Sequence, residues 1–408
     1  MLTVEEAQKL VLQHARRLPP VQAELSSSLL GHVLAEDVVS DIDMPPYDKS
    51  LMDGYAIRAA DFVGATSGDA ARVLAVIEEI PAGRLPQKTL AAGQASRIMT
   101  GAALPPGADA VVMIERTEAL DDRRVRILDP SVKPEQNVLR QGRELKSSDV
   151  VLTAGSVLRP QELGLLATVG KTSLKTYRQP LVALLSTGDE VVEPVARPAP
   201  GQIRNSNAAM LMGQIARAGC KHEYLGIARD TVESLRESIT AGLRCDFLLL
   251  SGGVSAGKFD LVPEVLKELG VQSIFHHVAM KPGKPLYFGV RGDALVFGLP
   301  GNPVSSMVGF ELFVRPALRV ALGKPDSGPR QVAARMTLDF HHKSDRPTYH
   351  PARLQSTDDG WRVTPVPWFG SPDLRAVTQA NAFAVFAAGE HDYRVDETVQ
   401  VLAPEMED

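Results

Sequence analysis

The chain is poor in cysteine and has no long apolar segment. Cys220 and Cys245 are its only cysteines in 408 residues, and they lack the CxxC spacing of a redox or zinc site. We therefore expect reduced structural thiols in a cytoplasmic protein. No apolar run approaches the roughly 20 residues that cross a bilayer, and residues 1–6 lack the basic flank and apolar core of a secretion signal. These absences argue against a membrane protein and a secreted one.

Basic charge is also scarce, since the formal net charge is −5. A protein without a basic excess is not expected to have nucleic acid as its main partner. Nine histidines are present, but 276–277 and 341–342 are adjacent pairs, whose side chains would point to opposite faces of a strand. No spacing is that of a zinc site, so structural or surface roles are expected for the histidines.

Length and turn signals predict several domains. With 44% hydrophobic and 23% charged residues, the chain resembles an ordinary globular protein, and its length predicts about two to four domains. Residues 1–178 are expected to form an α+β region of two subdomains. Helical spacing predicts a helix over 4–17, ended by two prolines, and another over 160–169 with Pro160 in its first turn.

A regular alternation after Pro180 predicts an α/β domain over 179–326. Strands are expected at 181–186, 222–227 and 246–251, and helices at 207–218, 231–242, 261–269 and 304–322. Strands that alternate with helices of this length imply a mainly parallel sheet with helices on both faces, a three-layer arrangement. A glycine- and proline-rich linker then leads to alternating apolar and polar residues, which predict a small all-β domain over 327–408.

The most informative segment is the glycine-rich stretch from Ser251 to Asp260, which follows the apolar run 246–250. A strand, a glycine loop and a helix in this order aim backbone N–H groups at an anion. The stretch also fits G-x-x-x-x-G-K, but Phe259 stands where a P-loop needs Ser or Thr. It fits G-x-S-x-G as well, which would make Ser255 an esterase nucleophile. A glycine turn that serves packing alone is a further alternative.

Three more glycine and proline loops follow or join strand-like segments, at 187–190, 278–285 and 299–305. Because the carboxyl ends of parallel strands meet at one edge of an α/β sheet, all four loops are expected to line one crevice. It would contain Lys281, Lys284, several carboxylates and many backbone amides. This mixture suits a phosphorylated ligand bridged by a divalent cation.

Six motifs stand in order along the chain: Pro45-Pro-Tyr-Asp-Lys-Ser-Leu-Met-Asp-Gly-Tyr-Ala56, Arg97-Ile-Met-Thr-Gly-Ala102, Ser186-Thr-Gly-Asp-Glu190, Ser251-Gly-Gly-Val-Ser255, Met280-Lys-Pro-Gly-Lys-Pro285 and Pro300-Gly-Asn-Pro303. Together they resemble the signatures of the molybdopterin molybdenumtransferases, the family of bacterial MoeA and of the gephyrin E domain. The similarity runs from the first residues to about Leu402. It implies an enzyme of molybdenum cofactor biosynthesis. In that family the α/β domain binds adenylylated molybdopterin, and magnesium-dependent insertion of molybdate releases AMP.

The resemblance also assigns roles to residues. Those implied in catalysis are Asp53, Thr100, Glu190, Asp230, Asp260, Lys281 and Lys284. Those implied in binding the ligand are Thr187, Gly188, Asp189, Gly252, Gly253, Ser255, Pro300, Gly301, Asn302 and Pro303. Those implied in holding Mg²⁺ are Asp260, Glu190 and Glu144.

Quaternary structure is implied in the same way. The resemblance predicts a homodimer in which Asp53 and Thr100 complete the cleft of a second subunit. A molybdopterin adenylyltransferase and molybdoenzymes are the other protein partners it suggests. The local alternative is that residues 52–55 form a tight turn in which Asp53 bonds only nearby amides.

The chain departs from the family pattern at six positions: Lys49, Leu139, Arg143, Glu144, Lys258 and His277. Leu139 replaces an arginine and Arg143 a glutamate, and an arginine cannot ligate a metal. His277 replaces a lysine, so its charge would depend on pH. A second class of function therefore stays open, a divergent relative that binds molybdopterin or finished cofactor without inserting metal. A hydrolase acting through Ser255 is the third alternative, and tungstate in place of molybdate also stays open.

Overall fold

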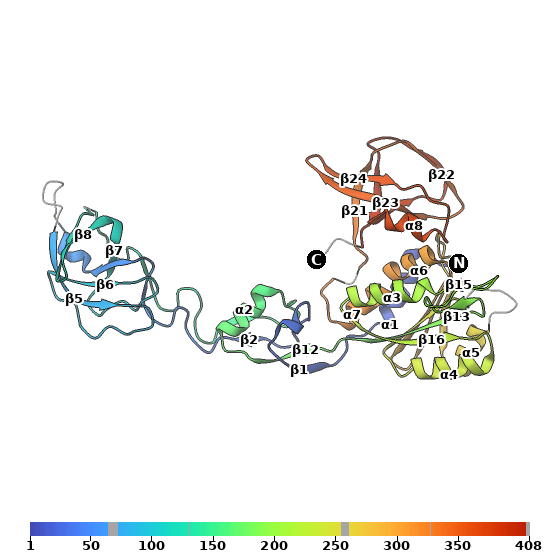
Figure 1. Ribbon diagram of the computed structural model, residues 1–408, viewed down its shortest axis with the longest axis horizontal. Helices are drawn as coiled ribbons and strands as arrows, with labels where there is room; N and C mark the ends of the chain where they lie inside the picture. The colour runs from blue at the N-terminus through green and yellow to red at the C-terminus, as the bar shows by residue number, and fades with distance from the viewer. Residues whose placement is uncertain (64–71, 130, 254–260, 327, 405–408) are drawn as a thin grey trace. The chain divides into compact units, whose positions relative to one another are not determined.

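The computed structural model describes residues 1–63, 72–129, 131–253, 261–326 and 328–404, and Figure 1 shows its elements. The chain forms two compact units. Unit 1 consists of Met1–Glu36, Gly155–Arg159 and Ser173–Asp408, and unit 2 consists of Asp37–Ala154 and Pro160–Thr172. Within the described ranges, no helix is both long and apolar enough to span a membrane.

Unit 1 contains a six-stranded sheet in the order β16-β13-β17-β20-β19-β18. The strands are β13 (Leu181–Thr187), β16 (Lys221–Ala228), β17 (Phe247–Ser251), β18 (Gln272–His277), β19 (Pro285–Arg291) and β20 (Ala294–Leu299). Strands β16, β13, β17 and β20 are parallel, whereas β19 is antiparallel to both of its neighbours. Strand β18 therefore runs with the parallel strands again. Their carboxyl ends and the start of β19 share one edge of the sheet.

Helices cover both faces of this sheet, as Figure 1 shows. On one face lie α1 (Val4–His14), α3 (Ser206–Arg217), α6 (Pro303–Gly309) and α7 (Arg315–Ala321), and on the other lie α4 (Val232–Gly242) and α5 (Val262–Glu268). Strand β17 is buried at every position, as expected of a strand covered on both sides. The predicted mainly parallel three-layer α/β architecture is confirmed.

The N-terminal helix α1 packs on this sheet although its sequence belongs to the first 178 residues. It begins with a capping box between Thr3 and Glu6, which satisfies two backbone donors at the helix start. Its apolar face buries Val4, Ala7 and Val11 in the same core as the strands.

The helix predicted over 304–322 is interrupted. A π-helical turn, Phe310–Val314, separates α6 from α7. Pro316 has no N–H to donate to the carbonyl oxygen of Leu312, so the regular helical bond is lost there. The side-chain amide of Gln8 donates to that oxygen instead, at 3.0 Å. Helix α1 thus supports the interruption.

The C-terminal part of unit 1 is a small β domain, as predicted. Its closed barrel has the order β21-β24-β23-β25-β27. The strands are β21 (Gln331–Met336), β23 (Thr348–Thr357), β24 (Gly360–Pro365), β25 (Ala382–Phe386) and β27 (Thr398–Leu402), and β22 (Phe340–Ser344) pairs with β26 (Gly389–Tyr393). One short helix, α8 (Leu374–Thr378), interrupts the β structure.

Unit 1 also includes the antiparallel pair β1 (Pro20–Glu24) and β12 (Ser173–Tyr177). Unit 2 has its own six-stranded sheet in the order β7-β4-β6-β5-β9-β8. The strands are β4 (Gly54–Ile57), β5 (Arg72–Ile80), β6 (Gln94–Ile98), β7 (Ala110–Met113), β8 (Thr117–Asp121) and β9 (Arg124–Ile127). It also has helix α2 (Pro160–Thr168) and two strand pairs, β3 (Lys49–Ser50) with β10 (Val138–Leu139) and β2 (Val38–Val39) with β11 (Val150–Leu152).

Candidate functional site

Three of the predicted loops meet at the carboxyl edge of the α/β sheet. Gly252, after β17, donates its N–H to the carbonyl oxygen of Leu299 at 3.1 Å. A Cβ on Gly252 would lie 2.7 Å from the carbonyl oxygen of Thr187, and one on Gly301 would lie 3.9 Å from Gly252 Cα. Gly252 also has a φ of +92°. The loops therefore approach backbone to backbone, and Gly252 is needed for both its φ and its missing side chain.

Asn207 of α3 fixes two of these loops and was not found from the sequence. Its Nδ2 donates to Ser251 Oγ at 2.9 Å and to the carbonyl oxygen of Gly301 at 2.8 Å. Its side chain is buried. Asn207 Oδ1 and Thr187 Oγ1 are both buried without a hydrogen-bond partner in the described part of the chain. These two polar atoms remain open to further hydrogen bonding at the loop edge.

Carboxylates gather beside the loop after β13. Asp230 donates its backbone N–H to Asp189 Oδ1 at 3.4 Å, and Glu190 folds back so that its Oε2 lies 2.6 Å from where a Cβ on Gly188 would be. Partial burial raises the pKa of Asp230, and the negative charges of Asp189 and Glu190 add to this shift. Negative charge is therefore concentrated here, and a cation would relieve the repulsion.

Among the described residues, potential metal ligands are less closely grouped than the concentration of negative charge suggests. The described residues include no group of three or more His, Cys, Asp or Glu side chains that could hold a metal ion. The predicted residues Ser255 and Asp260, and the departure Lys258, lie outside the described residues.

The lysine loop lies between β18 and β19 and is held by the C-terminal β domain. Lys281 donates its N–H to the carbonyl oxygen of Pro347 at 2.9 Å, and Tyr349 donates to the carbonyl oxygen of Lys281 at 2.7 Å. Arg346 Nη1 donates to the carbonyl oxygen of Met280 at 3.3 Å. A third cation, Arg346, thus contacts the loop that carries the two predicted lysines, and its Nε also lies 3.0 Å from Asp345 Oδ1.

His277 does not replace the charge of a lysine at neutral pH. Burial lowers the pKa of His277, and the nearby His276, Lys284 and N-terminal ammonium lower it further. Since the ordinary value is 6.5, the imidazole is neutral at pH 7.

The Pro300-Gly-Asn-Pro303 loop is tied to the β domain as well. Asn302 Nδ2 donates to Ser371 Oγ at 3.0 Å, and Val304 donates its N–H to the carbonyl oxygen of Ser371 at 3.1 Å. Asn302 and Pro303 occupy the N-cap and first position of α6, where proline is favoured. The loop is therefore fixed from both sides.

Asp53 and Thr100 contact each other in unit 2, where Asp53 directly precedes β4 and Thr100 follows β6. Thr100 donates both its N–H and its hydroxyl to Asp53 Oδ1, each at 2.7 Å. The Thr100 N–H, followed by its hydroxyl, lowers the pKa of Asp53, which keeps the exposed carboxylate ionised. The local bonds expected of a tight turn are thus present, and they leave a charged group at the surface.

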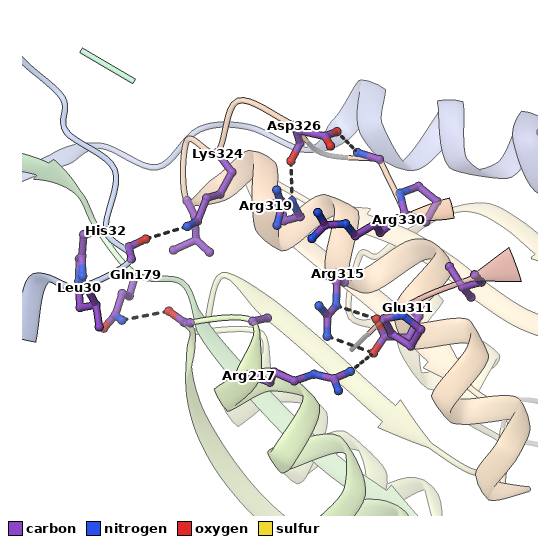
Figure 2. Close-up of a pocket in the computed structure, with 18 residues that line it drawn as sticks. Leu30, His32, Gln179, Arg217, Glu311, Arg315, Arg319, Lys324, Asp326 and Arg330 are labelled. Carbon is purple, nitrogen blue, oxygen red and sulfur yellow. Dashed lines mark hydrogen bonds and ion pairs between the residues drawn. The ribbon is translucent and has the colours of Figure 1, made fainter. Parts of the chain in front are cut away.

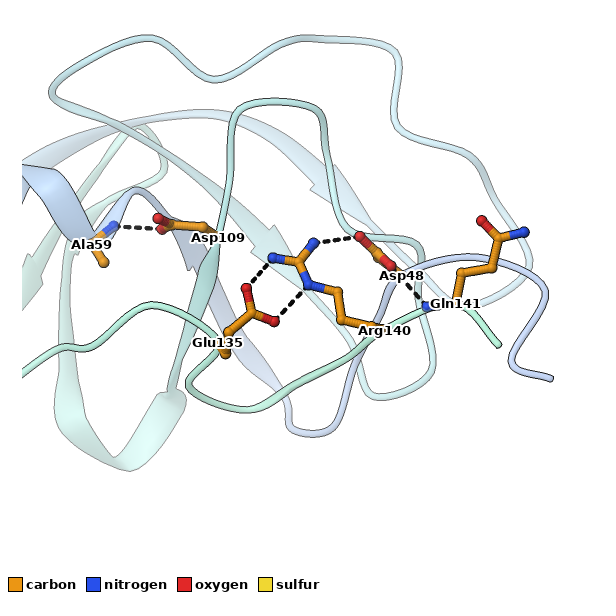
Figure 3. A network of polar contacts seen from close by, with 6 residues as sticks. All are labelled: Asp48, Ala59, Asp109, Glu135, Arg140 and Gln141. Carbon is orange, nitrogen blue, oxygen red and sulfur yellow. Dashed lines mark hydrogen bonds and ion pairs between the residues drawn. The ribbon is translucent and has the colours of Figure 1, made fainter. Parts of the chain in front are cut away.

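The altered segment near Leu139 keeps one arginine in an ion-pair network, shown in Figure 3. Arg140 pairs with Asp48 and with Glu135, and these two carboxylates raise its pKa. Leu139 itself pairs with Lys49 between β10 and β3. Arg140 therefore lies next to the position where the family arginine is missing, and two carboxylates balance its charge.

Glu144 belongs to unit 2, and its Oε1 lies 3.9 Å from Lys49 Nζ. Glu190 belongs to the loops of unit 1. Arg143, like Glu144, is exposed. The structure thus gives Glu144 a lysine neighbour, and its predicted role as a magnesium ligand stays a prediction.

Comparisons with known proteins cover nearly the whole chain. Residues 2–170 match the MoeA N-terminal region (domain I and II), residues 183–320 a probable molybdopterin binding domain, and residues 333–403 the MoeA C-terminal region (domain IV). The molybdopterin molybdenumtransferase of Bacillus subtilis is 35% identical over 406 residues, which cover 98% of this chain and 94% of the relative. That of Staphylococcus epidermidis is 34% identical over 405 residues, covering 99% and 96%. The crystal structure of a molybdopterin biosynthesis MoeA protein from Pyrococcus horikoshii superimposes with a TM-score of 0.84 at 31% identity, over 100% of both chains.

Proposed function

Because the chain belongs to the MoeA family of molybdopterin molybdenumtransferases, we propose that it inserts molybdate into adenylylated molybdopterin and releases AMP in a magnesium-dependent reaction. The observation that carries this proposal is that glycine loops, carboxylates and a lysine loop all lie along one edge of the α/β sheet. Such a site can hold phosphate and molybdate oxyanions close together. Insertion of molybdate with release of AMP requires molybdate and the adenylylated ligand to lie close together.

In the proposed reaction, the backbone amides and the charged side chains of the sheet edge have different roles. The glycine loops after β13, β17 and β20 expose backbone amides to the phosphates and the pterin. Lys281, Lys284 and Arg346 supply positive charge for molybdate and for the phosphate oxygens as the phosphate linkage breaks. Because the Lys281 loop is bonded to residues 347 and 349, the backbone that carries its lysines is held in place before the ligand arrives. This preorganisation favours the transition state over the free ligand.

The carboxylates fit Mg²⁺ in their chemistry. Asp189, Glu190 and Asp230 offer oxygen donors, and their mutual repulsion favours a bound cation. Mg²⁺ is usually held by one or two carboxylates together with waters and substrate phosphates, so a site completed by the substrate is sufficient. Bound there, the ion would neutralise charge on the phosphate oxygens. Asp260 is the further ligand that the family pattern suggests.

The proposed enzyme acts as a homodimer. Asp53 and Thr100 of one subunit complete the sheet-edge site of the other, with the ionised Asp53 facing the ligand. A molybdopterin adenylyltransferase is the proposed source of substrate, and molybdoenzymes are the proposed recipients of product.

An assay of AMP release alongside cofactor formation tests the function. We expect the purified protein to release AMP from adenylylated molybdopterin only when molybdate and Mg²⁺ are both present, and a serine-directed reagent to have no effect. A parallel assay of AMP release with tungstate in place of molybdate shows which oxyanion the protein uses. Tight binding of the substrate without AMP release would instead make the protein a cofactor-binding relative, and inhibition by the serine reagent would favour the hydrolase.

A further inference from the structure

Phe369 is an exposed aromatic residue of the C-terminal β domain. It is 93% exposed, whereas every other Phe, Tyr and Trp among the described residues is buried or half-buried. Single exposed apolar residues are common on protein surfaces, so exposure alone does not indicate a site. Two further observations distinguish Phe369. The turn that carries it is held by hydrogen bonds, and that turn contacts a loop of the candidate site.

The turn from Trp368 to Asp373 has a fixed backbone. The Trp368 indole packs edge-on against the His350 imidazole, with ring centroids 5.1 Å apart. Phe369 donates its backbone N–H to Asp373 Oδ2 at 3.2 Å, and Asp373 donates its N–H to the carbonyl oxygen of Gly370 at 3.0 Å. Trp368 packs against the core, whereas Phe369 faces solvent. The exposed ring is therefore attached to a backbone that is held on both sides.

This turn is bonded to the loop that follows β20 at the sheet edge. Asn302 Nδ2 donates to Ser371 Oγ at 3.0 Å, and Val304 donates its N–H to the carbonyl oxygen of Ser371 at 3.1 Å. Phe369 precedes Ser371 by two residues, and two residues of extended chain span at most about 7 Å. The Phe369 side chain is therefore within reach of a ligand held at the sheet-edge loops.

Helix α6, to which the turn is bonded, is itself fixed to α3. Glu311, in the π-helical turn that follows α6, is 2% exposed. Its carboxylate oxygens lie 3.0 Å from Arg217 Nη2 at the end of α3 and 2.7 Å from Arg315 Nε at the start of α7 (Figure 2). Gln214 of α3 donates to the same carboxylate at 2.7 Å. A buried network of this kind makes its surroundings rigid, so the support of the Phe369 turn is ordered before a ligand binds.

We propose that Phe369 stacks on a flat heteroaromatic ring of the ligand bound at the sheet-edge loops. A phenylalanine ring offers a large apolar face and has only two side-chain torsions, so it is ordered at low entropic cost. Stacking requires no hydrogen-bond pattern, because every such ring has a π face. The inference rests on the proposed function, since adenylylated molybdopterin contains two candidate rings, the adenine and the pterin. Both offer the same stacking chemistry.

Titration calorimetry of the full-length protein tests the stacking, with adenylylated molybdopterin and AMP as separate titrants in the absence of molybdate. Phe369→Ala removes the ring, Phe369→Leu retains an apolar side chain without a ring, and Phe369→Trp retains an aromatic face. Leu338→Ala is the matched control, because it shortens another exposed apolar residue of the same β domain. Without molybdate, stacking is measured even in a protein that binds the substrate and releases no AMP. Failure of the proposed function therefore does not hide it.

We expect Phe369→Ala to bind adenylylated molybdopterin about tenfold more weakly than the wild type. Phe369→Leu should lose about threefold or more, and Phe369→Trp should stay within about threefold. Leu338→Ala should bind as the wild type does, and all four variants should keep the wild-type unfolding temperature, because the changes are at the surface. A parallel loss of AMP affinity in Phe369→Ala assigns the stacked ring to adenine, whereas a loss confined to adenylylated molybdopterin assigns it to the pterin.

Four results would overturn the inference. The first is equal affinity of the wild type and Phe369→Ala for adenylylated molybdopterin. The second is wild-type affinity in Phe369→Leu, which would show an apolar cover without stacking. The third is an equal loss in Leu338→Ala, which would show a general effect of the surface. The fourth is a wild type that does not bind adenylylated molybdopterin, and this result alone would also contradict the proposed function.

Discussion

Asp53→Asn is expected to lower the rate of AMP release by about 10²–10³-fold and to leave the thermal unfolding temperature unchanged. The amide oxygen of asparagine can still accept both hydrogen bonds that Thr100 donates to Asp53 Oδ1. The turn is therefore preserved, and only the negative charge is removed. Single-turnover measurement of AMP release, together with thermal unfolding, separates the two effects.

Asp121→Asn is the matched control. Asp121 is an exposed aspartate of the same unit, and hydrogen bonds from Arg124 and from the N–H of Arg123 lower its pKa in the same way. Its replacement should leave AMP release at the wild-type rate. If Asp53→Asn also retained the wild-type rate of AMP release, Asp53 would have only a structural role in its turn. A lowered unfolding temperature in Asp53→Asn would likewise point to a structural role.

Gly252→Ala is expected to destabilise unit 1 by about 3 kcal/mol or more and to abolish AMP release. The new Cβ would lie 2.7 Å from the carbonyl oxygen of Thr187, so backbone must move against backbone. A φ of +92° adds strain for any residue with a Cβ, about 1–2 kcal/mol. Because this contact sets the spacing of two loops, the ligand site should be lost along with stability. Urea unfolding measures the loss of stability.

Gly270→Ala separates the two causes. Gly270 also has a positive φ, +78°, but nothing lies within 4 Å of where its Cβ would be. It should lose only the backbone term, about 1–2 kcal/mol, and retain AMP release. Equal losses in the two variants would show that the loops do not pack as closely as described.

Much of the α/β fold could be predicted because its strands are short apolar runs between glycine turns. Strand β17 illustrates this, since burial on both faces requires apolar residues throughout. The reversal of β19 was not predicted. Its signal was the Gly292-Asp293 pair, which joins β19 to β20 in a two-residue hairpin with Arg291 opposite Ala294.

Other features depend on contacts that a local pattern does not contain. Helical spacing predicts α1, but it does not say which sheet the helix covers. Pro316 gave a warning that the long helix would be interrupted, whereas the compensating bond from Gln8 joins residues 304 positions apart.

The candidate site, like the fold, was predictable only in its local features. The edge rule for parallel strands predicted that the loops after β13, β17 and β20 meet, and these three loops do so. It could not place Arg346 or Ser371, which reach the loops from a separate β domain. Asn207 was missed because an asparagine near the start of a helix usually indicates only local hydrogen bonding.

The central claim is that the Asp53–Thr100 pair of one subunit and the sheet-edge loops of the other form one active site. A heterodimer of an Asp53→Asn chain with a Lys281→Met chain, purified through two different tags, tests it through AMP release. Each parent homodimer should be nearly inactive. If sites are shared, the heterodimer contains one intact site of two and should recover about half of the wild-type rate. If each site is built within one chain, both sites carry a defect, and a heterodimer as inactive as its parents would contradict the claim.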